Sequence, residues 1–117
     1  MPDLQSTKFA IANGEIDALK LSLEDNKDSN IGALLMTAAD YGQVEALELL
    51  IKHGADVNYK DSNNITPLLC AVFEDHVKAA ECLIKHGAQF RKLTTPDGES
   101  YESVASSDAM KRALKSA

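Results

Sequence analysis

A block of six residues occurs twice in this chain at a fixed spacing. Leu50–Ala55 and Leu83–Ala88 both read LIKHGA, and the two copies are 33 residues apart. When the comparison is widened to 34–55 and 67–88, 11 of the 22 positions are identical. A period of this length is typical of solenoids, in which each repeat is one small unit and neighbouring units stack into a continuous core. The spacing therefore predicts a one-dimensional array of stacked repeats.

The clearer copy has the pattern of two antiparallel helices joined by a short turn. Thr66 offers a hydroxyl to the free N–H groups of a helix start, and Pro67 follows where its missing N–H costs nothing. Apolar residues then recur at helical spacing on either side of a turn near His76. Gly87 is suited to the left-handed conformation that ends a helix, and Gly54 has the same place one repeat earlier.

Weaker copies flank the two clear repeats. Ala10–Leu23 aligns with Ala38–Ile51 at an offset of 28 residues, and Ala105 lies 34 residues after Ala71. The period and the helix signals resemble ankyrin repeats, so we predict an all-α ankyrin-repeat solenoid of about four stacked helix-turn-helix repeats, with degenerate capping repeats. We place one domain at 1–117, with repeats at approximately 4–30, 31–63, 64–96 and 97–117. The expected helices lie near 6–12, 16–24, 34–40, 44–52, 67–73, 77–85, 101–106 and 108–114.

Composition and charge narrow the classes of partner. With 44% hydrophobic residues and only three prolines and six glycines, the chain has the composition of a folded domain. Its net charge of −6 disfavours nucleic acid and anionic membranes, and favours a protein partner with a basic surface. It has no cationic leader before an apolar run, and no apolar segment near the ~20 residues that a membrane helix needs. We therefore expect a soluble, monomeric protein of the cytoplasm.

The residue types that catalyse reactions or bind metals occur here in patterns that a structural role explains better than catalysis or metal binding does. Cys70 and Cys82 lie within the two helices of the third repeat, so we interpret them as small packing residues in a reducing compartment. His53 and His86 lie at equivalent helix ends, without the cysteine spacing of a zinc site. We expect the His76 ring to bond neighbouring backbone. Because no nucleophile with a base, phosphate-binding loop or carboxylate pair is found, we expect neither an enzyme nor a cofactor.

Repeat geometry predicts where a partner binds. In such arrays, the exposed side of the first helix of each pair and the extended connections between repeats, called fingers, line one concave surface. Asp40 and Tyr41 follow the alanine pair of the second repeat, and Phe73 and Glu74 occupy the same places one repeat later. An aromatic ring beside a carboxylate suits an arginine or lysine of a partner. The alternative is that Tyr41 and Phe73 pack against each other between repeats.

The finger between the second and third repeats supplies further candidate contacts. We select Tyr59, Lys60, Asp61 and Asn64 from this segment. Some of these residues have a second interpretation, because the side chains of Asn58, Asp61 and Asn64 are of the types that bond their own backbone in turns. The finger candidates therefore divide into contact residues and turn-building residues, and the sequence leaves that division open.

Beyond its repeats, the chain resembles the myotrophin family of small ankyrin proteins over nearly its whole length. The resemblance rests on an aromatic at Phe9 and on the segments Asn13–Asp17, Ala38–Gln43, Gly54–Asn58, Ile65–Leu69, Ala71–Val72 and Pro96–Gly98. It implies stoichiometric inhibition of the heterodimeric F-actin capping protein, through the basic surface by which capping protein holds the filament barbed end. It also implies a nuclear role in binding Rel-type transcription factors. By this resemblance, Phe9 joins the contact residues.

Three features depart from the family pattern. The first finger of the family is long and takes part in partner contact, whereas here only Ile31–Ala33 separate Asn30 from Leu34. Asp75 replaces the usual turn glycine, and Phe9 stands for a tryptophan. We expect the second finger to compensate for the short first one. The alternative function is a generic ankyrin-repeat adaptor, or an inhibitory subunit for a transcription factor or a kinase.

Overall fold

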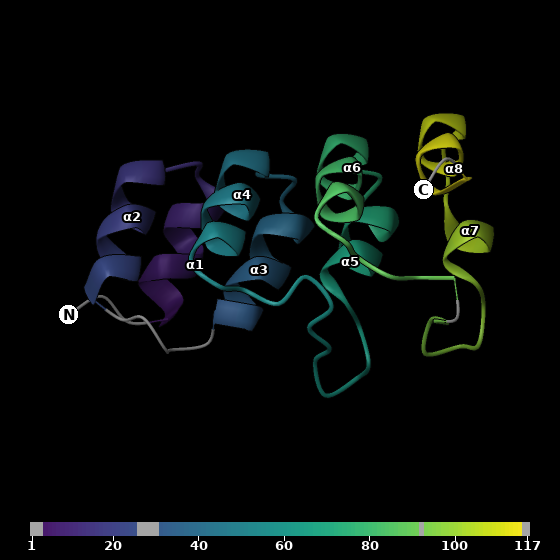
Figure 1. The fold of residues 1–117 in the computed structure, drawn as a ribbon, viewed down its shortest axis with the longest axis horizontal. Coiled ribbons are helices and arrows are strands. Elements are labelled where there is room, and N and C mark those ends of the chain that lie inside the picture. Colours follow the sequence, from purple (N-terminus) through teal and green to yellow (C-terminus); the bar gives the residue numbers. More distant parts are fainter. Residues whose placement is uncertain (1–3, 26–30, 92, 116–117) are drawn as a thin grey trace.

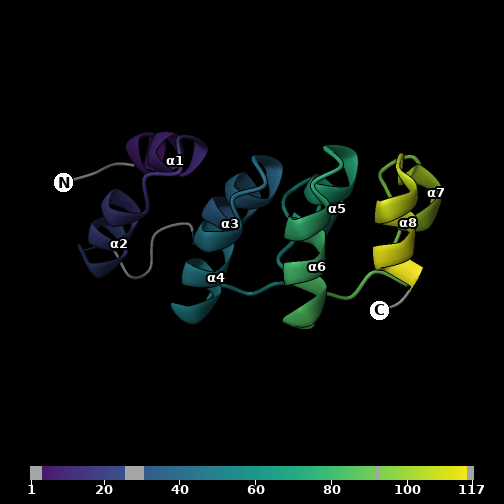
Figure 2. The same cartoon turned by 90° about the horizontal axis from the view of Figure 1, so that it is seen from above.

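The computed structural model describes residues 4–25, 31–91 and 93–115, which form helices joined by turns and longer connections (Figure 1). One row contains the first helix of each pair and the other row contains the second (Figure 2). The stack is 41 Å long and 25 Å by 20 Å across. The helices are α1 (Leu4–Ala12), α2 (Ile16–Asp25), α3 (Ile31–Asp40), α4 (Val44–Lys52), α5 (Pro67–Phe73), α6 (Val77–Lys85), α7 (Tyr101–Val104) and α8 (Asp108–Lys115).

Extended pairing is confined to one short connection. Thr94 and Ser100 form an isolated antiparallel bridge, and the described residues contain no longer strand. Every other regular element in those residues is a helix, and successive pairs pack along one axis. The predicted all-α solenoid of stacked helix pairs is therefore confirmed.

Local sequence sets several of the helix ends. The Thr66 side chain accepts a hydrogen bond from the Leu69 N–H at 3.2 Å, and Pro67 opens α5. Gly54 and Gly87 follow α4 and α6 with φ values of 98° and 97°, a conformation that glycine adopts without a steric cost. These caps are where the sequence places them, because a cap depends on residues only a few positions apart.

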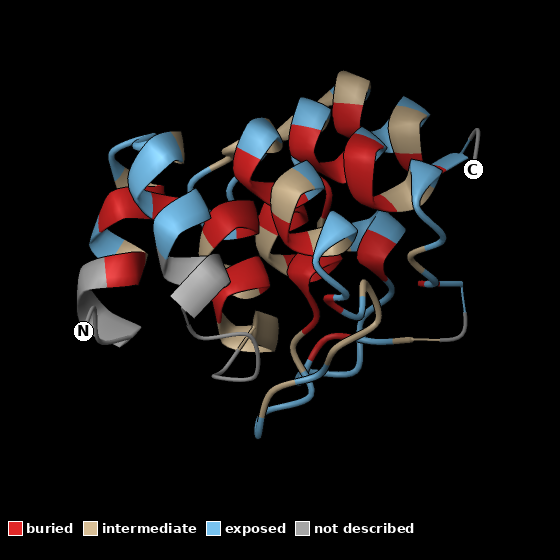
Figure 3. Cartoon of the chain, turned by 60° about the vertical axis from the view of Figure 1, so that its left-hand side comes forward, coloured by how far each residue is buried: buried red, intermediate tan, exposed pale blue. Residues whose placement is uncertain are grey.

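The core lies between the two helix rows (Figure 3). Leucines and alanines make up most of the buried residues of this core. Leu50 and Leu83, which are equivalent in the two central repeats, are both fully buried. In each LIKHGA block the leucine is thus in the core, while the lysine, histidine and glycine are exposed. The repeated block is mainly a packing and capping signal.

Five helix boundaries differ from the prediction. The start of α1 and the ends of α2 and α8 shift by only one or two residues, and the other two differences are in α3 and α7. α3 begins at Ile31, so Ile31–Ala33, interpreted from the sequence as the remnant of the first finger, form the first turn of a helix instead. Ile31 packs against the core, which favours the longer helix. The other residues expected near this finger, 26–30, lie outside the described residues. α7 ends at Val104 rather than near residue 106, because Ala105 has extended backbone with φ −65° and ψ 126°.

Candidate protein-binding surface

Four exposed residues follow the buried parts of α3 and α5. Asp40 and Tyr41 come directly after the last buried residues of α3, and Phe73 and Glu74 come after those of α5. Because successive helical residues are rotated by about 100°, these positions leave the core. Tyr41 is 53% exposed and Phe73 is 50% exposed. We call these four residues the turn surface.

Hydrogen bonds join neighbouring repeats near their turns, and one of them reaches the turn surface. His76 Nε2 donates to the backbone oxygen of Asp40 at 3.1 Å. The His76 ring also lies against Gly42, where an added Cβ would come within 2.6 Å of Nδ1. One repeat earlier, Gln43 Nε2 donates to the backbone oxygen of Ala12 at 3.3 Å. The predicted bond from the His76 ring to neighbouring backbone is therefore confirmed, and it positions Asp40.

Acidic side chains surround the exposed edge of α5. Burial, and then the carboxylates of Asp40, Asp61 and Glu74, raise the pKa of the Cys70 thiol to about 12. Asp40 is at the end of α3, Asp61 is in the connection between α4 and α5, and Glu74 directly follows α5. Negative charge from this connection and from the turn surface therefore acts on the same thiol. A thiol with such a pKa stays protonated at neutral pH and is a poor nucleophile. This negative charge instead favours a cationic group of a partner.

The finger, residues 56–65, is shaped by its own side chains. Asp61 Oδ1 accepts hydrogen bonds from the backbone N–H groups of Asn63 at 2.8 Å and Ile65 at 2.9 Å. Asn64 adopts a left-handed conformation with φ 63°, which asparagine tolerates better than most residues. Asp61 and Asn64 thus build the finger, in agreement with their turn-building interpretation, and their role in partner contact stays a prediction.

The other finger candidates have different surroundings. Tyr59 is half-buried, because its ring lies against Gly32 in the first turn of α3. Lys60 is exposed and free to extend into solvent. Ser62, which was not selected from the sequence, is exposed at the tip between Asp61 and Asn64. Its position between two turn-building residues is the signal that would have identified it.

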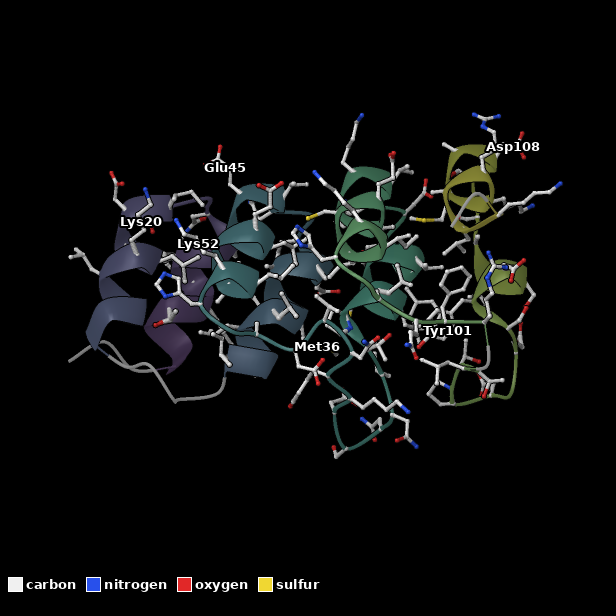
Figure 4. All side chains as sticks on the ribbon, in the orientation of Figure 1. Lys20, Met36, Glu45, Lys52, Tyr101 and Asp108 are labelled. Carbon is white, nitrogen blue, oxygen red and sulfur yellow. The ribbon has the colours of Figure 1, made fainter. Side chains whose placement is uncertain are left out.

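Exposed or partly exposed apolar residues also occur nearer the N-terminal end. Phe9 in α1 is 68% exposed, at the place that Cys70 has in the third repeat. Met36 of α3 is half-buried and points toward the side of the molecule from which the finger extends (Figure 4). Its equivalent Leu69 is fully buried, so two positions that repeat register makes equivalent differ in exposure. Leu21 of α2 is 63% exposed but belongs to the other helix row.

Aromatic packing occurs in the last repeat rather than at the turn surface. The rings of Phe90 and Tyr101 stack with centroids 6.4 Å apart. Tyr101 is buried, points from α7 toward α5 (Figure 4), and its hydroxyl lies 2.8 Å from Thr66 Oγ1. Within the described residues, no ring contact joins Tyr41 to Phe73, and both remain half exposed. The structure does not bear out the alternative in which these two rings pack together.

Two other kinds of site are absent from the described parts of the chain. Residues 4–25, 31–91 and 93–115 contain no group of three or more histidine, cysteine, aspartate or glutamate side chains placed to hold a metal ion. No helix in these ranges has the length and apolar character needed to cross a membrane. The candidate site is the turn surface together with the finger, because of their exposed aromatic and charged side chains.

Comparisons with known proteins agree with this architecture. The family model for ankyrin repeats, in three copies, matches residues 8–94. No curated protein sequence matches the chain. The crystal structure of the ankyrin repeat domain of Bcl-3, described as a unique member of the IkappaB protein family, is similar with a TM-score of 0.79 and 21% identity. The match covers 94% of this chain and 50% of that one, so this chain spans about half its length. The chain therefore belongs to the ankyrin-repeat family of protein-binding modules.

Proposed function

We propose that this ankyrin-repeat module binds a basic surface of a protein partner through the turn surface and the finger. The observation that carries the proposal is an exposed aromatic ring beside a carboxylate, within the acidic field that raises the Cys70 pKa. An arginine suits such a surface, because its guanidinium pairs with a carboxylate and stacks on a ring. The bond from His76 to Asp40 preorganises this surface, which lowers the entropy lost on binding.

The partner we propose is the F-actin capping protein, with this chain as its stoichiometric inhibitor. The support is the resemblance to the myotrophin family and the acidic character of the binding face. Occupying the basic surface by which capping protein holds the barbed end would exclude the filament. This function places a monomeric chain in the cytoplasm, with the nucleus as a second compartment.

An actin elongation assay tests this function. The purified chain should form a one-to-one complex with capping protein and slow the capping of barbed ends. Replacing Tyr41 and Phe73 together by Ala should weaken the complex by at least ~2 kcal/mol, the scale of interface hot spots. The matched control is Leu21→Ala, which removes a similarly exposed apolar side chain from the other helix row. Equal inhibition by the double variant and the wild type would remove the turn surface from the interface.

A second candidate function follows from the first turn of α3. Because residues 31–33 are helical, they do not form part of the long first finger expected of the myotrophin family. The second candidate is an adaptor, or an inhibitory subunit for a transcription factor or a kinase, using the same turn surface. It predicts no effect on capping even at a large excess of the chain. An unchanged capping rate would therefore favour it, and a pull-down from cytosolic extract would then identify the bound protein.

A further inference from the structure

A cavity of about 430 Å³ lies where α6 ends and the connection to α7 begins. Its walls are largely apolar and include Ile84, Ala88, Phe90 and Leu93. This volume falls within the roughly 300–1,000 Å³ of typical ligand sites. Ile84, Ala88 and Leu93 are only half-buried, so the cavity opens to solvent and a small ligand would stay wet on one side. The shape fits one apolar side chain of a larger partner better than an enclosed small molecule.

A positive charge lies at the rim of this cavity. Among its described lining residues only Arg91 is charged, and its guanidinium carbon lies 5.3 Å from the centroid of the Phe90 ring. Lys85, in the last turn of α6, is exposed and follows the lining residue Ile84 in the chain. Lys85 also suits the negative end of the α6 dipole. The surroundings of the cavity therefore favour an anionic group beside an apolar one.

The charge of the chain changes sign near the same place. Residues 1–83 carry 14 acidic and six basic side chains, a net charge of −8, whereas residues 84–117 carry four acidic and six basic, a net charge of +2. α8, which packs against α6, exposes Lys111, Arg112 and Lys115. A partner attracted to this end of the stack differs in charge from the basic partner of the turn surface.

We propose that this cavity is a second binding site, which takes an acidic peptide segment bearing one large apolar side chain. The apolar side chain fills the cavity, and the flanking carboxylates meet Arg91 and Lys85. The site is separate from the turn surface, because the nine residues of α6 span about 14 Å between the turn after Phe73 and the cavity. It does not depend on the function proposed for the turn surface.

A synthetic peptide with one phenylalanine between two runs of glutamates is the probe, labelled for fluorescence anisotropy. We expect saturable binding, with the backbone amide signals of Gly87, Ala88 and Leu93 shifting in an NMR titration while those of Tyr41 and Phe73 stay in place. Exchanging the peptide's phenylalanine for alanine should weaken binding about tenfold or more, because it removes the buried apolar group. Exchanging its glutamates for glutamines should weaken binding as well.

Two variants of the chain test the role of charge. Arg91→Glu reverses the charge at the rim and should weaken peptide binding about fivefold or more. Lys78→Glu makes the same charge change on an exposed residue at the other end of α6, and should bind the peptide like the wild type. Unchanged binding by Arg91→Glu, or shifts confined to other amides, would overturn the proposal. Shifts of the cavity amides on raising the protein concentration alone would identify a second copy as the occupant, and overturn it too.

Discussion

Gly32 allows the Tyr59 ring of the finger to pack against the first turn of α3. A glycine within a helix costs about 1 kcal/mol relative to alanine, yet here the ring of Tyr59 fills the space that a side chain would need. The contact joins the base of the finger to the first turn of α3. The local cost of the glycine is thus offset by a contact between segments almost thirty residues apart in the chain.

Replacing Gly32 by alanine tests this contact. We expect Gly32→Ala to lower the free energy of unfolding by about 1–3 kcal/mol, because the added methyl group collides with the Tyr59 ring. Urea unfolding measures the change. In a Tyr59→Ala background the same replacement should be neutral or stabilising, since only the gain in helix propensity remains. Equal losses in both backgrounds would show that the ring is not the cause.

Cys70 makes stability depend on pH in the alkaline range. Burial and neighbouring carboxylates raise its pKa from 9.0 to about 12 in the folded chain. The folded state therefore holds the Cys70 proton more tightly than the unfolded state does. The resulting contribution to the free energy of unfolding is complete below about pH 9 and is lost as pH rises toward 12. Burial also raises the pKa of Tyr101, which acts in the same direction.

Urea unfolding across this pH range checks the sign. The wild type should lose stability as pH rises above about 9, and Cys70→Ala should show a shallower loss. Tyr101→Phe removes the second group and serves as a comparison. If the stability of the wild type rises with pH in this range, the assignment of a raised pKa to Cys70 is contradicted.

At the scale of the element, α6 has one face packed in the core and one face exposed to solvent. Leu83 is fully buried, whereas Glu81 is exposed in the same helix. We expect Leu83→Ala to cost about 2–5 kcal/mol, because the neighbouring repeats cannot fully close the space that it leaves. Leu50→Ala in α4 should cost a similar amount, since the two leucines are equivalent.

Thermal unfolding followed by circular dichroism measures these losses. Glu81→Ala is the control within α6 and should change the free energy of unfolding by no more than about 0.5 kcal/mol. A Leu83→Ala variant that melts within a few degrees of the wild type would contradict the repeat register. Similar losses for Leu50 and Leu83 would support equal roles for the two central repeats.

At the scale of the whole molecule, we predict that the placement of charge on one helix row matters more for partner binding than the net charge of the chain does. If the proposed complex with capping protein forms, Asp40→Asn with Glu74→Gln should weaken it and reduce its sensitivity to salt, because exposed charges are screened by ions. Glu45→Gln with Glu48→Gln makes the same change in net charge on exposed residues of α4, in the other helix row. Calorimetric titration at low and high salt compares the affinities of the two double variants. Equal effects would assign the binding to overall charge.

Much of the fold follows from the sequence by itself. The 33-residue spacing, the threonine and proline at the start of α5 and the glycines after α4 and α6 predicted helix pairs and most of their boundaries. These features act between residues a few positions apart, or repeat at a fixed offset, so they can be read along one chain. The register also identified Leu50 and Leu83 as equivalent residues, and both are buried.

The exposure of individual side chains and the contacts between distant segments depend on the tertiary structure alone. Repeat register left open whether Tyr41 and Phe73 pack together or face solvent, and it missed the contact of Tyr59 with Gly32 that joins the finger to α3. The stack of Phe90 on Tyr101 and the cavity beyond α6 were also invisible in the sequence. Each depends on which surfaces meet through space once the repeats have stacked. A repeated pattern specifies equivalent positions, but the shortened last repeat and the individual side chains give those positions different neighbours.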